Sequence, residues 1–200
     1  VNDIGVQVKT DFLMAVFPDR HQHLFEPSPA YHAQLEANYR EAGIAYRQHK
    51  IALSDTDGLL YLHKTSVDGS GRVIHTQIRP ERDEAMRLLV GIKEIPTRRP
   101  DSVFAPDALP DLSYLVKLDV DGVEEQIIAG GQRLLRNASF VIIETSIGRQ
   151  DLCRRAALLE QLGFRLFDLF GNAYCYGRLV LVDLVMINNR LRADEFKFRP

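Results

Sequence analysis

Short apolar runs alternate with amphipathic segments along most of this chain. Strand-like runs occupy 1–5, 23–26, 50–53, 114–120 and 140–144, and helix-like segments occupy 11–17, 28–43, 122–135 and 152–162. This alternation predicts βαβ units that build a mostly parallel sheet, and therefore an α/β fold. The runs 114–120 and 140–144 are apolar on both faces, so we expect them at the centre of that sheet.

The pattern loosens between residues 56 and 110. We expect turns there around short extended pieces at 59–63 and 73–77. The segment 79–90 is a helix candidate with a solvated charged face, and the four prolines of 93–110 predict extended or looping backbone. No composition shift marks a domain boundary in this region, so we expect a single domain over 1–200.

The C-terminal part differs in kind from the rest of the chain. The strand-like runs 164–169 and 179–187 follow one another with no helix between them, which predicts an antiparallel pair. An exposed apolar face on this pair would favour a dimer, although the sequence does not determine the oligomeric state.

Charge and composition exclude several classes of protein. The 200 residues include 25 Lys and Arg against 27 Asp and Glu, giving a net charge of −2, so we expect no nucleic-acid partner. No run approaches the ~20 apolar residues of a membrane-spanning helix, and no signal-peptide pattern is present, so we expect a cytoplasmic protein without a membrane segment. The chain opens with Val1 inside a strand-like run, and we expect that N-terminal residues are missing from it.

Acidic residues and glycines collect where the predicted strands end. These positions are Asp3, Gly5, Glu26, Ser54, Asp55, Asp119, Asp121 and Glu144. In open α/β sheets ligands bind beyond the carboxyl ends of the strands, so these side chains are the candidates for a binding site. Glu26 follows Gly5 by 21 residues, a spacing that suits a carboxylate binding both hydroxyls of a ribose. A nucleoside-containing cofactor is therefore expected, but an NAD site is disfavoured because the GxGxxG fingerprint is absent.

In these residues the chain resembles the FkbM-type S-adenosylmethionine-dependent methyltransferases. The most specific part is Lys-Leu-Asp-Val-Asp-Gly-Val-Glu at 117–124, which is close to the family's K-x-D-V-(D/E)-G-x-E signature. The second most specific part is Phe-Glu-Pro at 25–27. The other matching runs follow in the family's order and span nearly the whole chain: 3–5, 52–55, 143–144, 163–166 and 182–185.

The resemblance implies a class I methyltransferase fold, which is Rossmann-like. Such a fold has a seven-stranded, mostly parallel sheet with helices on both faces and a C-terminal antiparallel hairpin. The resemblance also implies S-adenosyl-L-methionine as the cofactor. Asp3 and Gly5 would approach its methionine part, Glu26 would bind the ribose hydroxyls, and Ser54 and Asp55 would lie near the adenine.

The implied reaction is methyl transfer to a hydroxyl group of a small molecule, a natural product or a sugar. In-line displacement depends mainly on positioning, together with a group that handles the hydroxyl proton. Asp119 is the candidate for that group, with Lys117, Asp121 and Glu144 as neighbours that orient the acceptor or shift its pKa. Two nearby carboxylates could instead hold Mg²⁺, and this alternative stays open.

One position departs from the family pattern, whose first motif usually runs D-x-G-A-N-x-G. The second glycine is Lys9 here, and its side chain could crowd a close approach of the backbone to the cofactor. Two outcomes stay open: Lys9 points outward or pairs with the cofactor's carboxylate, or the site is weakened. The second outcome would make the protein a binding module that keeps the methyltransferase fold without catalysis.

Purely structural roles also stay open for the candidate residues. Asp119 could cap the helix that follows it, and Glu144 could pair with a buried Arg or Lys. Ser54 and Asp55 could serve local hydrogen bonding in a turn. The sequence does not identify the methyl acceptor, because acceptor pockets of this fold are built from variable insertions.

Overall fold

Two sheets make up the fold of this computed structural model, which describes residues 1–66, 75–86, 89–106, 108–148 and 151–191. The main sheet has seven strands in the order β10 (Phe164–Cys175), β11 (Arg178–Asn188), β9 (Phe140–Ser146), β8 (Leu115–Leu118), β1 (Asn2–Ile4), β2 (Gln22–Phe25) and β3 (Tyr46–His49). The second sheet has four strands in the order β4 (Ala52–Leu53), β7 (Leu89–Arg98), β5 (Gly58–Thr65) and β6 (His75–Arg79). The helices are α1 (Asp11–Val16), α2 (Pro29–Glu41), α3 (Pro100–Val103), α4 (Glu124–Gly130), α5 (Gln132–Arg136) and α6 (Asp151–Gln161).

The main sheet is mixed. Strands β3, β2, β1, β8 and β9 pair in parallel, whereas β11 pairs antiparallel with both β9 and β10. The predicted α/β fold is confirmed, with a mixed sheet of seven strands. The two runs apolar on both faces, which form β8 and β9, lie inside the sheet as expected.

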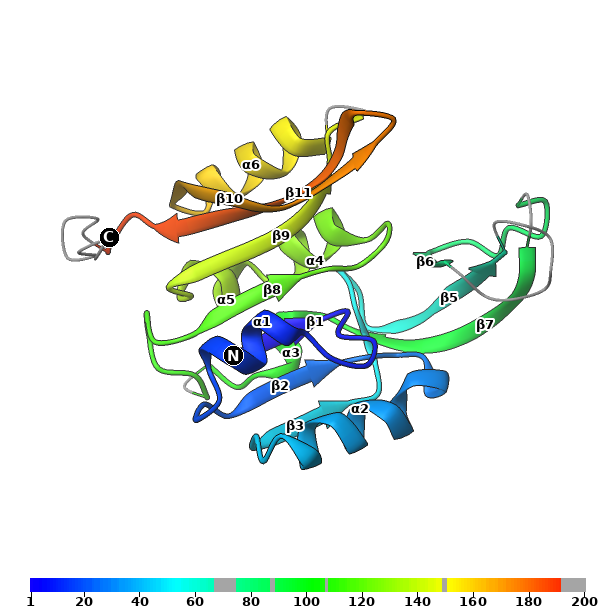
Figure 1. Ribbon diagram of the computed structural model, residues 1–200, viewed down its shortest axis with the longest axis horizontal. Coiled ribbons are helices and arrows are strands. Elements are labelled where there is room, and N and C mark those ends of the chain that lie inside the picture. Colours follow the sequence, from blue (N-terminus) through cyan, green and yellow to red (C-terminus); the bar gives the residue numbers. More distant parts are fainter. Residues whose placement is uncertain (67–74, 87–88, 107, 149–150, 192–200) are drawn as a thin grey trace.

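Helices cover both faces of the main sheet (Figure 1). On one face, Leu24 of β2 packs with Leu35 and Tyr39 of α2, and Met14 of α1 packs against the same small core. The larger core on the opposite face includes Phe25 and the buried residues of α4, α5 and α6. Because successive side chains of a strand point to opposite faces, neighbours such as Leu24 and Phe25 enter different cores.

The third strand of the main sheet is not the predicted one. The run 50–53 was expected to form it, but β3 is Tyr46–His49, and Ala52–Leu53 pairs with β7 in the second sheet. The edge strand β3 is mostly polar, so its sequence lacks the apolar signal that marks the next residues.

Two helix predictions are also corrected. The segment 79–90 is not helical in its described part: it lies between the end of β6 and the start of β7. The segment 122–135 is two short helices rather than one. They meet at Gly131, where a side chain would press against the ring of Pro100.

The loosely patterned region forms most of the second sheet, which stands beside the ends of β2 and β8 (Figure 1). Strands β5, β6 and β7 pair antiparallel, confirming the expectation of extended pieces in this region. The backbone N–H of Ile78 in β6 donates to the carbonyl of Asp121, which follows β8, over 3.1 Å. This bond ties the second sheet to the carboxyl end of the main one.

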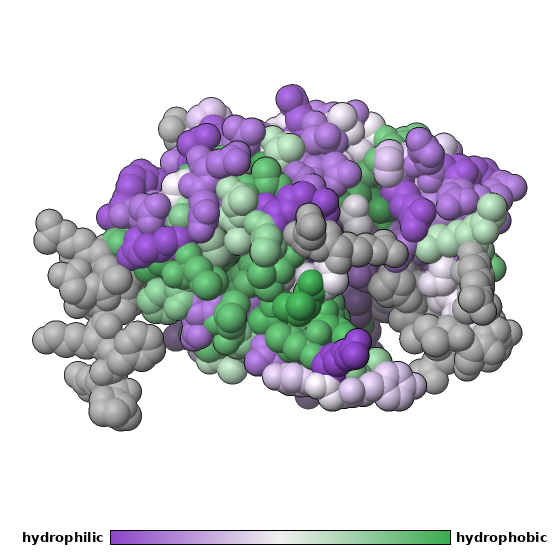
Figure 2. All heavy atoms as spheres, turned by 90° about the horizontal axis from the view of Figure 1, so that it is seen from above, coloured by the Kyte–Doolittle hydropathy of each residue, from purple (hydrophilic) through white to green (hydrophobic). Residues whose placement is uncertain are grey.

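The surface carries apolar side chains along the β10–β11 edge. Seen from above, apolar surface gathers in the middle and lower part of the molecule, whereas polar side chains dominate the upper rim (Figure 2). The exposed large apolar residues of this hairpin are Leu166, Leu169, Tyr174, Tyr176 and Val180. Among the described residues, no helix has the length and apolarity that crossing a membrane requires.

Candidate functional site

The strand register places the ends of the central strands at one level. Phe25 of β2, Ile4 of β1 and Leu118 of β8 are neighbours in register, and Leu118 in turn pairs with Ile143 of β9. The residue after each of them therefore stands in one row across the sheet, with adjacent strands about 4.8 Å apart. The row consists of Glu26, Gly5, Asp119 and Glu144.

Glu26 ends β2 and is 4% exposed. Its Oε1 accepts a hydrogen bond from the backbone N–H of Ser28 over 2.7 Å, and its Oε2 accepts one from the N–H of Gln7 over 2.9 Å. Burial raises the pKa of Glu26 to about 7, although both hydrogen bonds oppose this shift. Since a carboxylate offers about four lone-pair sites, each oxygen keeps room for one more donor, as binding of a diol requires.

Gly5 lets two chain segments approach closely. It has a φ of +89°, and a side-chain carbon there would overlap the backbone carbonyl of Asp119. The N–H of Gly5 donates to the carbonyl of Phe25 over 3.0 Å, and the N–H of Asp119 donates to that of Ile4 over 2.9 Å. Gly5 thus holds the ends of β2, β1 and β8 together.

Lys117, Asp3 and Asp119 form a charged group on the face that carries α1. The side chain of Lys117 is 4% exposed, donates to the carboxylate of Asp119, and lies 4.0 Å from Oδ1 of Asp3. Asp3 is fully buried, and neither of its carboxylate oxygens has a hydrogen-bond partner among the described residues. Burial raises the pKa of Asp3, while the Lys117 ammonium opposes that shift. Lys117 is therefore the cation that balances these two acids.

Asp119 does not serve as a helix cap. Helix α4 begins at Glu124, its N-cap is Val123, and no side chain caps it. The Asp119 carboxylate instead bonds to Lys117 and is 38% exposed, so it remains accessible to a ligand.

Glu144 lies half-buried beside Asp119 in the row. Its carboxylate has no Arg or Lys partner among the described residues; Arg155 donates instead to its backbone carbonyl over 2.8 Å. Burial, reinforced by the nearby charges of Asp119 and Asp183, raises the pKa of Glu144 to about 7.

A small, partly open cavity of about 40 Å³ lies between the two sheets at this end of the molecule. Main-sheet residues of the row meet side chains of β5 and β6 there, and the lining consists of Gly5, Gln7, Glu26, Pro27, Leu62, Thr76, Ile78, Asp119, Val120 and Asp121. Glu26, the carboxylate predicted to bind the ribose, and Asp119, the carboxylate predicted to act on the methyl acceptor, thus line the same cavity.

Ser54 and Asp55 lie outside this lining. The Ser54 carbonyl packs so closely against Gly130 of α4 that a side chain there would overlap it. The Ser54 hydroxyl donates to Oδ1 of Asp55 over 3.1 Å, which is the local hydrogen bonding considered for this pair. The structure therefore does not bring the two residues predicted for the adenine to the cavity lined by Glu26.

Lys9 points outward and is partly exposed. Its ammonium pairs with Asp11 over 2.9 Å. The non-glycine residues with positive φ in the described part are Gln7, Leu112 and Tyr176, so the backbone at Lys9 accepts a side chain without strain. Gln7, with a φ of +51°, is the residue of this loop that contacts Glu26.

The described residues offer no set of three His, Cys, Asp or Glu side chains arranged to hold a metal ion. We therefore assign no ligand set to Mg²⁺.

The sequence prediction missed several residues of this site. The backbone of Gln7 reaches Glu26, and Leu62, Thr76 and Ile78 close the cavity from the second sheet. A further acid, Asp183, faces Glu144 across the β9–β11 pair. Asp183 interrupts the otherwise apolar run 179–187, which marks it as an acid within a strand but does not identify its neighbour in the sheet.

Comparisons with known proteins agree with this fold. A family model described as the methyltransferase FkbM domain matches residues 3–166. The chain is 26% identical over 152 residues to the 2-O-methyltransferase NoeI of Sinorhizobium fredii (strain NBRC 101917 / NGR234). The match covers 72% of this chain and 62% of the relative, so the chain spans less than two thirds of the relative's length.

Two solved structures share the fold. The first is the methyltransferase FkbM from Methylobacillus flagellatus KT, with a TM-score of 0.55 and 14% identity over 92% of this chain and 42% of that one. The second is magnesium protoporphyrin IX methyltransferase (ChlM) from Synechocystis PCC 6803 with bound SAM, with a TM-score of 0.52 and 11% identity. That match covers 94% of this chain and 68% of the other.

Proposed function

The chain belongs to the methyltransferase FkbM domain family, and from that premise we propose that it transfers a methyl group from S-adenosylmethionine to a hydroxyl oxygen. The acceptor class is a small molecule, a natural product or a sugar. NoeI, a 2-O-methyltransferase, supports transfer to oxygen.

The observation that carries the proposal is the placement of Glu26. Its buried carboxylate is fixed by two backbone N–H groups. Its remaining lone pairs are free to accept hydrogen bonds beside Gly5 and Asp119, in the cavity between the two sheets. A buried acid with free lone pairs is costly unless a donor completes it, and the vicinal hydroxyls of a ribose provide two donors. Glu26 therefore fits the ribose hydroxyls of the cofactor.

S-Adenosylmethionine, when bound, supplies an electrophilic methyl group on a positively charged sulfur. The residues of the chain bind and orient the reactants. Lys117 holds the Asp119 carboxylate in place at the cavity, where this carboxylate accepts hydrogen bonds from the substrate and orients it for attack. Asp3, buried beside Lys117, keeps the ammonium in this position.

Calorimetric titration with S-adenosylhomocysteine tests the cofactor site without knowledge of the acceptor. We expect one-to-one binding to the wild-type protein and about 10- to 100-fold weaker binding to Glu26→Gln, since charge-assisted hydrogen bonds contribute roughly 1.5–3 kcal/mol. Glu41→Gln, an exposed acid at the end of α2, is the matched control and should bind like the wild type.

Two results would contradict the proposal. A folded wild-type protein that does not bind S-adenosylhomocysteine would remove the methyltransferase function and favour the non-catalytic binding module. Equal affinities for the wild type and Glu26→Gln would show that Glu26 is not the ribose ligand.

A further inference from the structure

Asp183 extends the row of acids beyond Glu144. In the antiparallel β9–β11 pair, Asp183 is the register partner of Glu144, so both side chains project from the same face at adjacent positions. This is the face of Lys117 and Asp119, because Lys117 pairs with Ile142, two residues before Glu144. The row therefore leads from Glu26 past Asp119 to the Glu144–Asp183 pair.

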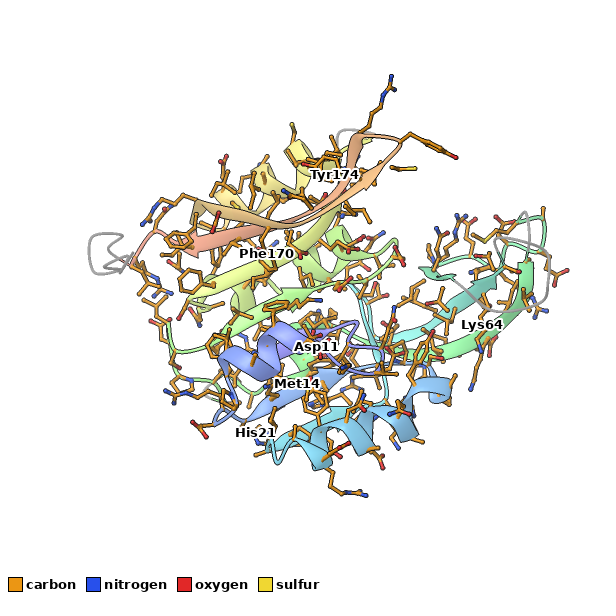
Figure 3. The ribbon with its side chains drawn as sticks, in the orientation of Figure 1. Asp11, Met14, His21, Lys64, Phe170 and Tyr174 are labelled. Atoms are coloured by element: carbon orange, nitrogen blue, oxygen red, sulfur yellow. The ribbon has the colours of Figure 1, made fainter. Side chains whose placement is uncertain are left out.

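The hairpin leaves space for the Asp183 carboxylate. Gly171 has a φ of +64° in a segment of β10 where the register shifts, and a side-chain carbon there would overlap the Asp183 carboxylate. Phe170, the register partner of Asp183, lies on the face that carries α1, above Asp11 in Figure 3. Its ring contacts that of Phe12 in α1, with 5.2 Å between ring centroids. An aromatic wall thus stands beside the acid pair.

The charges that face the pair come mainly from β8 and the loop after it: Lys117, Asp119 and Asp121. Among the described residues, no cation or hydrogen-bond donor pairs with either carboxylate of Glu144 and Asp183. A negative charge on one of two adjacent carboxyl groups disfavours ionisation of the other. Burial raises the pKa of Asp183 as well as that of Glu144.

Lys117 keeps N–H donors at this row, although it is ion-paired with Asp119 and Asp3. Its ammonium is nine-tenths or more buried and carries three N–H donors, yet within the described ranges it donates one hydrogen bond, to Asp119. The remaining donors suit an oxygen-bearing ligand at the edge of the row.

We propose that Glu144 and Asp183 act as one proton-sharing pair that receives the proton of the acceptor hydroxyl, with Glu144 as the receiving group and Asp183 as its positioning residue. This inference rests on the proposed methyl-transfer function. It places the acceptor over β9 and β11, beside the acid pair.

The step balances as a simple displacement. The acceptor oxygen forms a bond to the methyl carbon while the sulfur–carbon bond breaks, and that electron pair stays on sulfur. The O–H proton passes to the ionised carboxylate of Glu144, while the proton that the pair already holds stays on Asp183. No oxidant, reductant or further reactant takes part.

Titration of the Glu144 carboxyl tests the pair without an acceptor. The ¹³C shift of its side-chain carboxyl carbon is followed against pH in the wild-type protein and in Asp183→Asn. We expect the Glu144 midpoint to fall by about one pH unit or more in Asp183→Asn, because a neighbouring negative charge is removed. Asp19→Asn, an exposed acid after α1, should leave the midpoint unchanged. An unchanged midpoint in Asp183→Asn would overturn the pairing.

Methyl transfer tests the role of the pair in the reaction. The probe is a mixture of methyl glycosides with methyl-labelled S-adenosylmethionine. We expect the pH at half-maximal rate to fall in Asp183→Asn in parallel with the Glu144 midpoint, and Glu144→Gln to lower the rate about 100-fold or more. A pH profile in Asp183→Asn identical to the wild type would overturn the role in proton transfer.

Gly171→Ala separates crowding of Asp183 from backbone strain. Gly177 also has a positive φ, +76°, but no atom lies within 4 Å of a side-chain carbon placed there. Gly177→Ala therefore introduces backbone strain without crowding any side chain. We expect Gly171→Ala to shift the Glu144 midpoint and Gly177→Ala to leave it unchanged. Equal Glu144 midpoints in the two variants would show that the absence of a side chain at Gly171 does not matter for the Glu144–Asp183 pair.

Binding of S-adenosylhomocysteine distinguishes failure of this inference from failure of the proposed function. Asp183→Asn should bind it with wild-type affinity, because Asp183 lies beyond the cavity lined by Glu26. Absence of binding to the wild type would contradict the proposed methyltransferase function. Intact binding together with an unshifted Glu144 midpoint in Asp183→Asn would contradict only the acid pair.

Discussion

Individual residues at the strand ends combine structural and chemical roles. Gly5 stands in a motif expected to approach the cofactor, yet its closest neighbour in the fold is the carbonyl of Asp119. The glycine is therefore required by the contact between two strand ends, whatever else it contacts. Glu26 likewise organises the loop of Gln7 through backbone hydrogen bonds while it lines the cavity.

Replacing Gly5 with alanine should destabilise the fold strongly. The new methyl group would clash with the Asp119 carbonyl, and φ at this position is +89°, so we expect a loss of about 3 kcal/mol or more in the free energy of unfolding. Gly43→Ala is the control, because Gly43 has a φ of +67° and open space around it. It should lose about 1 kcal/mol in the same urea titration. Similar losses in both variants would show that the contact with Asp119 is unimportant.

Much of the site could be predicted at this scale, because acids at the ends of parallel strands converge at one edge. Glu26, Asp119 and Glu144 stand in one row for that reason. Asp183 could not be predicted as their neighbour, since its position depends on the antiparallel insertion of β11 beside β9. Ser54 and Asp55 follow a strand that left the main sheet, so their proximity to the cavity could not be judged from the sequence.

At the scale of elements, the apolar pattern predicted buried strands better than edge strands. The central strands β8 and β9 were predicted directly from their apolar runs, whereas β3 is polar and was missed in favour of the apolar segment 50–53 that follows it.

Glu124, the last residue of the family signature, has a structural role at the scale of elements. Its carboxylate pairs with Arg155 of α6 over 2.9 Å in a nearly buried ion pair, which clamps α4 to α6.

Breaking this clamp should cost more than breaking an exposed ion pair. Arg155→Met leaves Glu124 buried without its cation, so we expect a loss of about 3 kcal/mol in the free energy of unfolding. Arg154→Met is the control, because Arg154 pairs with Glu125 and Asp151 at the surface, and it should lose less than about 1 kcal/mol. Chemical denaturation of both variants measures the difference. The clamp would be refuted by equal losses.

The double variant Glu124→Gln with Arg155→Met provides a further check. Removing both charges relieves the unpaired buried acid, so the double variant should be more stable than Arg155→Met alone. A purely additive loss would indicate that the two side chains do not interact.

At the scale of the whole molecule, the cavity belongs to both sheets. Glu26 and Asp119 come from the main sheet, and Leu62, Thr76 and Ile78 come from the second. A ligand bound between these residues would link the two sheets, which the sequence pattern did not distinguish. The loosely patterned region is therefore a wall of the site rather than a peripheral loop.

Binding of S-adenosylhomocysteine should consequently protect the second sheet. We expect slower amide hydrogen exchange in β5 and β6 as well as around Glu26, because ligand binding opposes local opening. The hairpin tip at Tyr176 lies outside the cavity lining and is the internal control. Protection confined to the main sheet would mean that β6 takes no part in the site.

The central position of β1 affects how the sheet folds during synthesis. Asn2 pairs with His23 on one side and with Val116 on the other, so β1 lies between one strand that is near in the sequence and one that is distant. One side of β1 stays unpaired until β8 has been synthesised. Folding of the central sheet therefore depends on contacts between distant segments, which form slowly. Until then the nascent chain exposes an open strand edge, which makes the early chain a substrate for chaperones.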